Sequence, residues 1–285
     1  MTGIRVPSHI EFTVRDKRRD STHLTMMDKD PIVRSKPQKP LYLLKHQWNL
    51  ARYHVQESFH LLRGREIVHL LHIGKTGGTA VKHAIKSNPV TTAYLIRRHG
   101  HRTVLRHIPN GQRVVFFLRD PQTRFVSGFY SRLREGRPRF NNPWSPVERS
   151  IFERFPTPNA LAHGLFSEDP EERRHAEQAT RTIAHVRDSY MRWFESEEYL
   201  LSRLADIFFI GFQETLNDDF QRLKSKLGLP DSLALPDDDI LAHRSPTDLD
   251  RKLDPEAVRN LRRWYDADYQ LVEFCRRRAP QINAG

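Results

Sequence analysis

The segment HIGKTGGTAV, which runs from His72 to Val81, is the most informative part of this chain. An apolar run, residues 67–71, comes directly before it and predicts a short buried strand. Residues 80–86 have the composition of the first turns of a helix. A strand, a turn rich in glycine and threonine, and a helix N-terminus build a cradle for an anion, because backbone N–H groups and the helix dipole point at the ligand. We therefore expect a phosphate or sulfate group to bind here, with Lys75 adding a full positive charge.

The order of residues in this segment differs from that of the nucleotide-hydrolysing P-loop. That motif runs G-x-x-x-x-G-K-[ST], so its glycines precede the lysine. Ending the motif at Gly74-Lys75-Thr76 would require glycine at position 69, which is His69. Here the pair Gly77 and Gly78 follows the lysine instead, and their amides are expected to wrap the anion. The simpler alternative is a turn that only connects strand to helix, although such a connector has no need of a lysine and two threonines.

A second segment predicts another anion contact. Residues 113–118 are rich in β-branched and aromatic residues and predict a strand, which ends at Arg119. Pro121 suits the first turn of a following helix. Ser127 lies eight residues after Arg119, about two helical turns along, so the guanidinium and the hydroxyl are placed to converge on one phosphate. The alternative is a local ion pair between Arg119 and Asp120.

The segments Ile73–Thr79 (IGKTGGT) and Leu118–Tyr130 (LRDPQTRFVSGFY) together resemble the two signature motifs of the sulfotransferases. They are most similar to the carbohydrate branch that includes the heparan sulfate and chondroitin O-sulfotransferases. The resemblance implies the donor 3′-phosphoadenosine 5′-phosphosulfate (PAPS), with adenosine 3′,5′-bisphosphate (PAP) as product. It assigns the 5′-phosphosulfate to Lys75, Thr76, Gly77, Gly78, Thr79 and Ala80, and the 3′-phosphate to Arg119 and Ser127. It also implies donor contacts from Arg244 and Ser245, in a loop that closes over the nucleotide.

A histidine segment, RRHGH at residues 97–101, resembles the part of the glycan 2-O-sulfotransferases that carries their catalytic histidine. A sugar hydroxyl is a poor nucleophile, so a positioned base must take its proton during transfer. Histidine titrates in the appropriate range, and neighbouring arginines favour its neutral form. We expect His101 to be this base and rank His99 second, with Lys75 stabilising the bridging oxygen of the leaving nucleotide. There are two alternatives. The histidines are surface residues without a catalytic role, or the base is a glutamate, as in other sulfotransferases.

The fold expected from these segments is an α/β fold, P-loop-like, with a mainly parallel central sheet flanked by helices. Residues 1–38 are polar and predict a flexible arm, and residues 39–285 predict a single sulfotransferase domain. A third buried strand is predicted at 207–212. Five prolines in residues 138–158 predict a loop-rich insertion that acts as a lid or acceptor-binding wall. Helices are predicted over residues 41–62, 171–204, 218–227 and 254–275.

The charge of the chain favours an anionic ligand. The formal net charge is +12, and residues 91–140 contain eleven arginines against two carboxylates, a field that steers anions towards the cleft. The same charge fits a basic face that binds nucleic acid nonspecifically. The sequence therefore leaves three functions. The favoured one is a PAPS-dependent sulfotransferase whose acceptor carries a hydroxyl group, preferably on a carbohydrate. The alternatives are an ATP-dependent kinase or NTPase with a divergent phosphate loop and a non-catalytic polyanion-binding protein.

The cysteine count and the hydropathy of the chain bear on the cellular compartment in which the protein works. The single cysteine, Cys275, excludes an internal disulfide framework. No run of roughly twenty apolar residues and no signal-peptide pattern occurs, unlike the membrane anchor typical of Golgi glycan sulfotransferases. We expect a soluble, cytoplasmic, bacterial relative, the alternative being a trimmed chain. No metal is expected, since the second strand ends in Arg119 rather than Asp and no tight Cys/His cluster is present.

Overall fold

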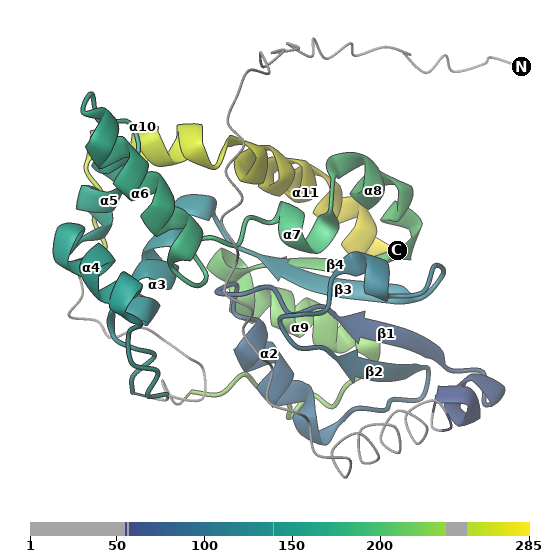
Figure 1. Ribbon diagram of the computed structural model, residues 1–285. Helices are drawn as coiled ribbons and strands as arrows, with labels where there is room; N and C mark the ends of the chain where they lie inside the picture. The colour runs from purple at the N-terminus through teal and green to yellow at the C-terminus, as the bar shows by residue number, and fades with distance from the viewer. Residues whose placement is uncertain (1–54, 56, 139, 238–249) are drawn as a thin grey trace, which may run out of the picture. The chain divides into compact units, whose positions relative to one another are not determined.

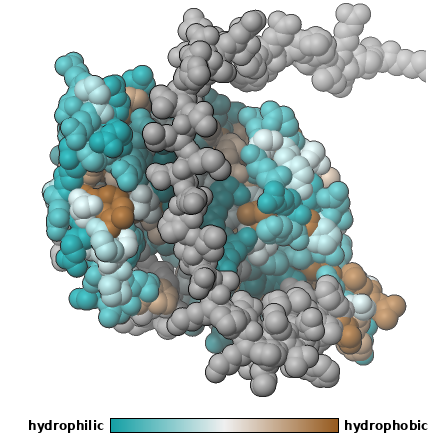
Figure 2. All heavy atoms as spheres, viewed as in Figure 1, coloured by the Kyte–Doolittle hydropathy of each residue, from teal (hydrophilic) through white to brown (hydrophobic). Residues whose placement is uncertain are grey.

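The computed structural model describes residues 55, 57–138, 140–237 and 250–285 (Figure 1). The predicted arm at 1–38 and the predicted donor residues Arg244 and Ser245 lie outside these ranges. So does most of the predicted helix at 41–62, of which residues 57–62 are helical. Figure 2 shows brown apolar surface at the end of the molecule where this helix lies, and Phe59, Leu61 and Leu62 are among its exposed side chains.

The centre of the structure is a four-stranded sheet in the order β2-β1-β3-β4, in which every pairing is parallel. The strands are β1 (Glu66–Leu70), β2 (Tyr94–Arg98), β3 (Arg113–Leu118) and β4 (Ile207–Phe212). Three of them confirm the strands predicted at 67–71, 113–118 and 207–212. The edge strand β2 was not predicted, because its three apolar residues are followed directly by two arginines and β1 is its only neighbour in the described sheet.

Alternating residues of β3 build two cores, one on each face of the sheet. Val114, Phe116 and Leu118 face one core and Val115 and Phe117 face the other. The first core is covered by α7 (Met191–Phe194), α8 (Glu197–Ser202) and α11 (Asp266–Ala284). The second is covered by α2 (Gly78–Ala84) and α9 (Leu216–Leu227), as Figure 1 shows. A parallel sheet with helices on both faces confirms the predicted α/β class.

A third core lies among helices beside the sheet, in the group on the left of Figure 1. It is built by α3 (Pro121–Leu133), α4 (Pro146–Arg154), α5 (Pro158–Gly164), α6 (Pro170–Thr182) and α10 (Pro255–Trp264). Each of these helices has proline in its first turn and a side-chain cap before it. Proline fits there because the N–H it lacks has no helical partner at that position.

These helix starts correct the interpretation of residues 138–158 as a loop-rich insertion. Pro146 and Pro158 begin helices rather than interrupting them, and α4 occupies much of the segment. Ser145 caps α4 by accepting a hydrogen bond from the Glu148 N–H, and Thr157 caps α5 in the same way through Ala160. Proline content alone does not distinguish a loop from successive capped helices.

Two predicted helices are broken in the structure. The helix predicted at 171–204 ends with α6 at Thr182, and residues 183–190 are not helical before α7 and α8. The helix predicted at 254–275 divides at Tyr265 into α10 and α11. The helix predicted at 218–227 is confirmed as α9, which ends at Gly228 with φ of 64°. Four short 3₁₀ helices complete the described elements: η1 (Ile85–Ser87), η2 (Leu105–His107), η3 (Leu204–Asp206) and η4 (Gln213–Thr215).

The topology places the two sequence motifs together. Because β1 and β3 are parallel neighbours, the loops that leave their carboxyl ends meet at one edge of the sheet. These loops carry Lys75 and Arg119. Within the described ranges, no helix combines the length and apolar character needed to cross a membrane.

Candidate functional site

The loop after β1 has a conformation that requires glycine at two positions. Gly77 has φ of 82°, a left-handed conformation, and a Cβ there would lie 2.8 Å from a methyl carbon of Leu216. A Cβ on Gly78 would lie 2.9 Å from the ring of His72. Both glycines therefore allow the chain to turn tightly from β1 into α2. This is the turn expected of the anion cradle.

The threonine hydroxyls of this loop have partners within the protein. Thr76 is buried and its hydroxyl donates to the Ile73 carbonyl at 3.0 Å, so it stabilises the loop rather than facing outward. The Thr79 hydroxyl lies 3.3 Å from Nε2 of His72. The N–H of Ala80 donates to the Gly77 carbonyl at 3.0 Å. Of the residues predicted for the 5′-phosphosulfate, Thr76 and Ala80 thus have evident structural roles.

Lys75 is the charged residue of the loop and also has a left-handed backbone, with φ of 68°. Burial and the nearby guanidinium groups of Arg119 and Arg134 lower the pKa of its ammonium to about 8. Charges of one sign held close together in a partly buried place oppose folding, and they are characteristic of a site for the opposite charge. Lys75, Arg119 and Arg134 thus form a cationic cluster, the kind of arrangement that suits an anion.

Arg119 connects the two loops. Its backbone N–H and C=O both bond to the hydroxyl of Tyr190, at 2.9 and 2.6 Å. Its Nε donates to Thr123 at 3.0 Å, and Nη1 lies 3.5 Å from the Lys75 carbonyl. The adjacent N–H of Asp120 donates to Glu214 at 2.7 Å, which gives that glutamate a structural role. Hydrogen bonds thus fix both the backbone of Arg119 and its guanidinium, which lies next to the Lys75 loop.

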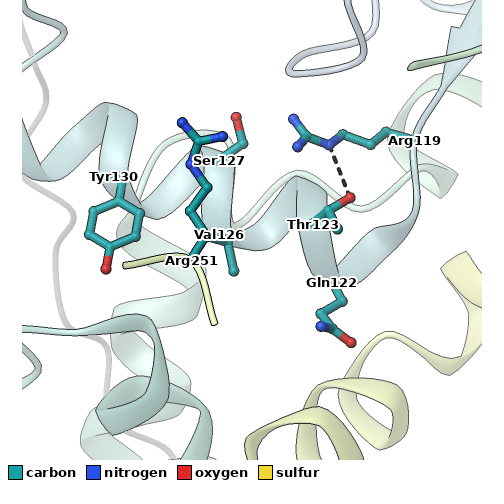
Figure 3. A pocket seen from close by; sticks show the side chains of 7 residues that line it. All are labelled: Arg119, Gln122, Thr123, Val126, Ser127, Tyr130 and Arg251. Atoms are coloured by element: carbon teal, nitrogen blue, oxygen red, sulfur yellow. Dashed lines mark hydrogen bonds between the residues drawn. The ribbon is translucent and has the colours of Figure 1, made fainter. Parts of the chain in front are cut away.

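A small pocket of about 80 Å³ lies along α3, and both Arg119 and Ser127 line it. In Figure 3 their polar ends point to the same side of α3, together with the guanidinium of Arg251. The predicted pairing of Arg119 with Ser127 is therefore present in space. Arg251 was not predicted, because it comes from a segment far along the sequence that carries no recognisable motif.

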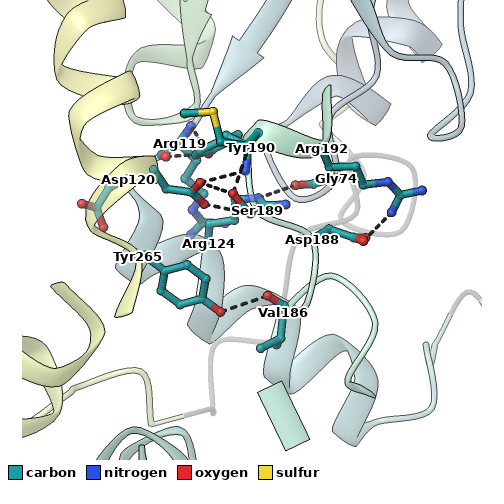
Figure 4. A network of polar contacts seen from close by, with 12 residues as sticks. Gly74, Arg119, Asp120, Arg124, Val186, Asp188, Ser189, Tyr190, Arg192 and Tyr265 are labelled. Atoms are coloured by element: carbon teal, nitrogen blue, oxygen red, sulfur yellow. Dashed lines mark hydrogen bonds and ion pairs between the residues drawn. The ribbon is translucent and has the colours of Figure 1, made fainter. Parts of the chain in front are cut away.

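Arg124, a buried residue of α3, fixes the first loop through a hydrogen bond to the backbone of Gly74. Its Nε donates to the Gly74 carbonyl at 3.0 Å, and its guanidinium lies over the rings of Tyr190 and Trp193. The carboxylate of Asp268, at the start of α11, is 4.0 Å from Nη1. Figure 4 shows Arg124 with Gly74 and Tyr190, residues of the loop and of the segment before α7. In the sequence, Arg124 was only one position of the second motif, and no role was predicted for it.

His101, the residue predicted to be the base, lies beside the loop, with Nδ1 3.9 Å from the place that a Cβ on Gly74 would take. Its ring packs against that of His72 at an interplanar angle of 30°, with centroids 3.9 Å apart, and it is hydrogen-bonded to the backbone of His72. Partial burial, assisted by the nearby ammonium of Lys82, lowers the pKa of His101. Lys82 itself donates to Nδ1 of His72 at 3.2 Å and to the carbonyl of His99 at 2.6 Å. A neutral, oriented imidazole is the form that accepts a proton.

His99, the second predicted candidate, is occupied elsewhere. Its Nε2 is 2.7 Å from Nδ1 of His69, whose Nε2 in turn meets the side-chain oxygen of Gln112. Because that oxygen can only accept, His69 donates to it, and His99 donates to His69. Burial and the neighbouring His69 and Lys82 lower the pKa of His99 to about 4. This geometry favours His101 over His99 as the base.

A third histidine, His185, also lies at the loop and was missed by the sequence analysis. Its ring is 5.9 Å from that of His101, centroid to centroid, in an edge-to-face arrangement. It belongs to the non-helical residues after α6, which had been predicted as helix. Despite this concentration of histidines, no group of three or more His, Cys, Asp or Glu side chains in the described ranges is arranged to hold a metal ion.

Comparison with known proteins shows the family of the chain. The model of the sulfotransferase family matches residues 64–274, which include every strand and both loops. No curated protein and no solved structure matches the chain. Since the matched region covers well over half of its length, the chain belongs to the sulfotransferase family.

Proposed function

We propose that this protein transfers a sulfuryl group from PAPS to the hydroxyl of a carbohydrate, with His101 as the base. The observation that carries the proposal is the meeting of two anion-binding elements at one sheet edge. The Lys75 loop provides one, and the pocket lined by Arg119 and Ser127 provides the other. A nucleotide with negative groups at both its 5′ and 3′ positions matches two such elements, whereas a single phosphate needs one.

The residues present fit this donor. The amides at the start of α2 and the ammonium of Lys75 are the groups we assign to the 5′ end, and Arg119, Ser127 and Arg251 to the 3′-phosphate. PAPS, when bound, supplies an activated sulfuryl group on a stable leaving group. Lys75 is placed to stabilise the negative charge that develops on leaving, which is the usual role of a fixed cation in such transfers. The loop orients the group, and Arg124 in turn fixes the loop through Gly74.

His101 is the residue we assign to deprotonation of the acceptor. Its contact with the His72 backbone fixes one ring nitrogen, which leaves the other to receive a proton. The lowered pKa keeps the ring neutral at physiological pH, so it is ready to act as a base.

A carbohydrate acceptor is supported by a hollow of about 590 Å³ beyond the end of α3. It is lined by Trp144 and by three arginines, Arg134, Arg137 and Arg149. The volume is in the range of small-ligand sites, and an aromatic face with guanidinium groups suits the mixed apolar and polar surface of a sugar. Arg134 also helps to lower the pKa of Lys75, so this side of the hollow lies within electrostatic range of the Lys75 loop.

Titration calorimetry tests the donor site without knowledge of the acceptor. We expect PAP to bind without metal and more tightly than ATP with magnesium. Arg119→Ala should weaken PAP binding by about 2 kcal/mol, the scale for losing a charged hydrogen-bond partner. The matched control is Arg113→Ala at the opposite end of β3, where the arginine pairs with Glu66 instead. A preference for ATP with magnesium would favour a kinase, and salt-sensitive binding without nucleotide preference would favour a polyanion-binding protein.

A further inference from the structure

His185 has an unusual backbone conformation for its residue type. It lies between α6 and α7 with φ of 69°, in the left-handed region. Side chains other than glycine rarely adopt this conformation, and it persists where the surroundings impose it, often at functional sites. The contacts around His185 are therefore expected to impose its conformation.

Contacts with the C-terminal helices fix the chain on both sides of His185. The hydroxyl of Tyr265 donates to the Val186 carbonyl at 2.9 Å. The buried carboxylate of Asp268 accepts hydrogen bonds from the Ser189 hydroxyl at 2.5 Å and from the Tyr190 N–H at 2.9 Å. Figure 4 shows Tyr265, Val186, Ser189 and Tyr190 in this arrangement. The segment is thus held in place independently of the His185 ring.

Two glycines make room for His185 at the site. A Cβ on Gly74 would lie 3.0 Å from Nδ1 of His185 and 3.9 Å from Nδ1 of His101. A Cβ on Gly128 of α3 would lie 3.3 Å from the His185 backbone and Cβ. The first glycine lets both imidazoles approach the loop next to Lys75, and the second lets the segment pass close to α3.

The charged groups around His185 keep its ring neutral. Burial is the main cause that lowers its pKa to about 3, and the positive charges of Lys75 and Arg124 act in the same direction. Protonation of His101 would add a further positive charge nearby, while Asp188 acts in the opposite sense. His185 is therefore an uncharged ring at physiological pH and makes its contact with His101 by packing.

We propose that His185 is a positioning residue of the transfer site, which holds the ring of His101 against His72. The ring of His101 contacts two others: that of His72, tilted by 30° with centroids 3.9 Å apart, and that of His185, which meets it edge to face at 5.9 Å. The proposal rests on the proposed function in one respect, that His101 is the base. A base acts only when its nitrogen is fixed relative to the reacting hydroxyl, so loss of the flanking ring weakens this function without removing the base.

The test is a titration of the His101 ring by NMR, in which His101→Asn identifies its signal. We compare His185→Asn, which tolerates the left-handed backbone but removes the ring, with His185→Phe, which keeps an aromatic edge without nitrogen. In His185→Asn, His101 should become more solvated, so its pKa should rise towards 6.5 and its preference for one tautomer should be lost. In His185→Phe both should stay as in the wild type. His175→Asn, a change of the same kind at a half-buried position of α6 where the ring contacts Glu171, should alter neither.

The outcomes separate this proposal from the proposed function. Unchanged titration of His101 in folded His185→Asn would overturn the positioning role, and so would failure of His185→Phe to retain the wild-type behaviour. If His185→Asn does not fold, the phenylalanine variant alone decides. PAP binding is measured in the same samples and should change less than twofold. Absence of PAP binding in the wild type would contradict the donor site but leave the titration result valid.

Discussion

At the scale of single residues, Lys75 gives the site its pH dependence. Its pKa of about 8 in the free protein means that the ammonium is charged at pH 7 and mostly neutral at pH 9. Binding of an anion requires the charged form, so affinity should fall as pH rises through 8. PAP should bind about tenfold more weakly at pH 9 than at pH 7, as follows from one proton lost above its pKa.

Lys75→Arg is the matched control for this pH effect. A guanidinium remains protonated over the whole range, so the variant should bind PAP with nearly the same affinity at both pH values. Calorimetry at pH 7, 8 and 9 on both proteins measures the difference. Equal pH dependence in the two proteins would assign the effect to another group.

At the scale of elements, stability depends on the buried network that links α11 to the first loop through Arg124. Asp268 accepts from Ser189 and Tyr190 and lies beside Arg124, which holds the Gly74 carbonyl. Asp268→Ala leaves the buried guanidinium without this carboxylate and removes the oxygen that accepts both hydrogen bonds. We expect a loss of about 3–5 kcal/mol in the free energy of unfolding, as for other broken buried pairs.

Urea unfolding measures this loss, and two variants calibrate it. Asp268→Asn retains an acceptor oxygen for Ser189 and Tyr190, so it should be less destabilising than the alanine variant. Asp266→Ala removes an exposed carboxylate from the same helical turn and should cost under about 1 kcal/mol. Similar losses in Asp268→Ala and Asp266→Ala would show that the buried network contributes little to stability.

The elements also show how far sequence reasoning reached. The sequence predicted strands β1, β3 and β4 and the start of α3. Continuous apolar runs and a proline in the first turn of a helix are local features, so they can be recognised without the fold. The same reasoning placed Arg119 and Ser127 in one site, since their spacing is set within a single strand–helix unit. It missed β2 and the break before α7, since an edge strand and the anchoring of Tyr190 by Asp268 depend on contacts distant in sequence. His185, Arg124 and Arg251 became visible as site residues for the same reason, only once the chain was folded.

At the scale of the whole molecule, positive charge is the dominant property. Eleven arginines fall within residues 91–140, and several of them line the two hollows beside α3. A field of this kind accelerates the approach of an anion without contacting it. Because salt shortens the range of the field to about 10 Å at 0.1 M, the association rate of PAP should fall as salt is added.

Two arginines matched in their local pairing test whether the position of the charge matters. Arg137 lines the larger hollow and pairs with Glu135 at 2.9 Å, while Arg113 starts β3 and pairs with Glu66 at 2.8 Å. Each glutamine variant removes one charge and one ion pair. Stopped-flow measurement at low salt should show a slower association of PAP in Arg137→Gln than in Arg113→Gln, with the difference vanishing at about 1 M salt. Equal rates at low salt would mean that net charge, rather than its concentration beside the transfer site, governs the encounter.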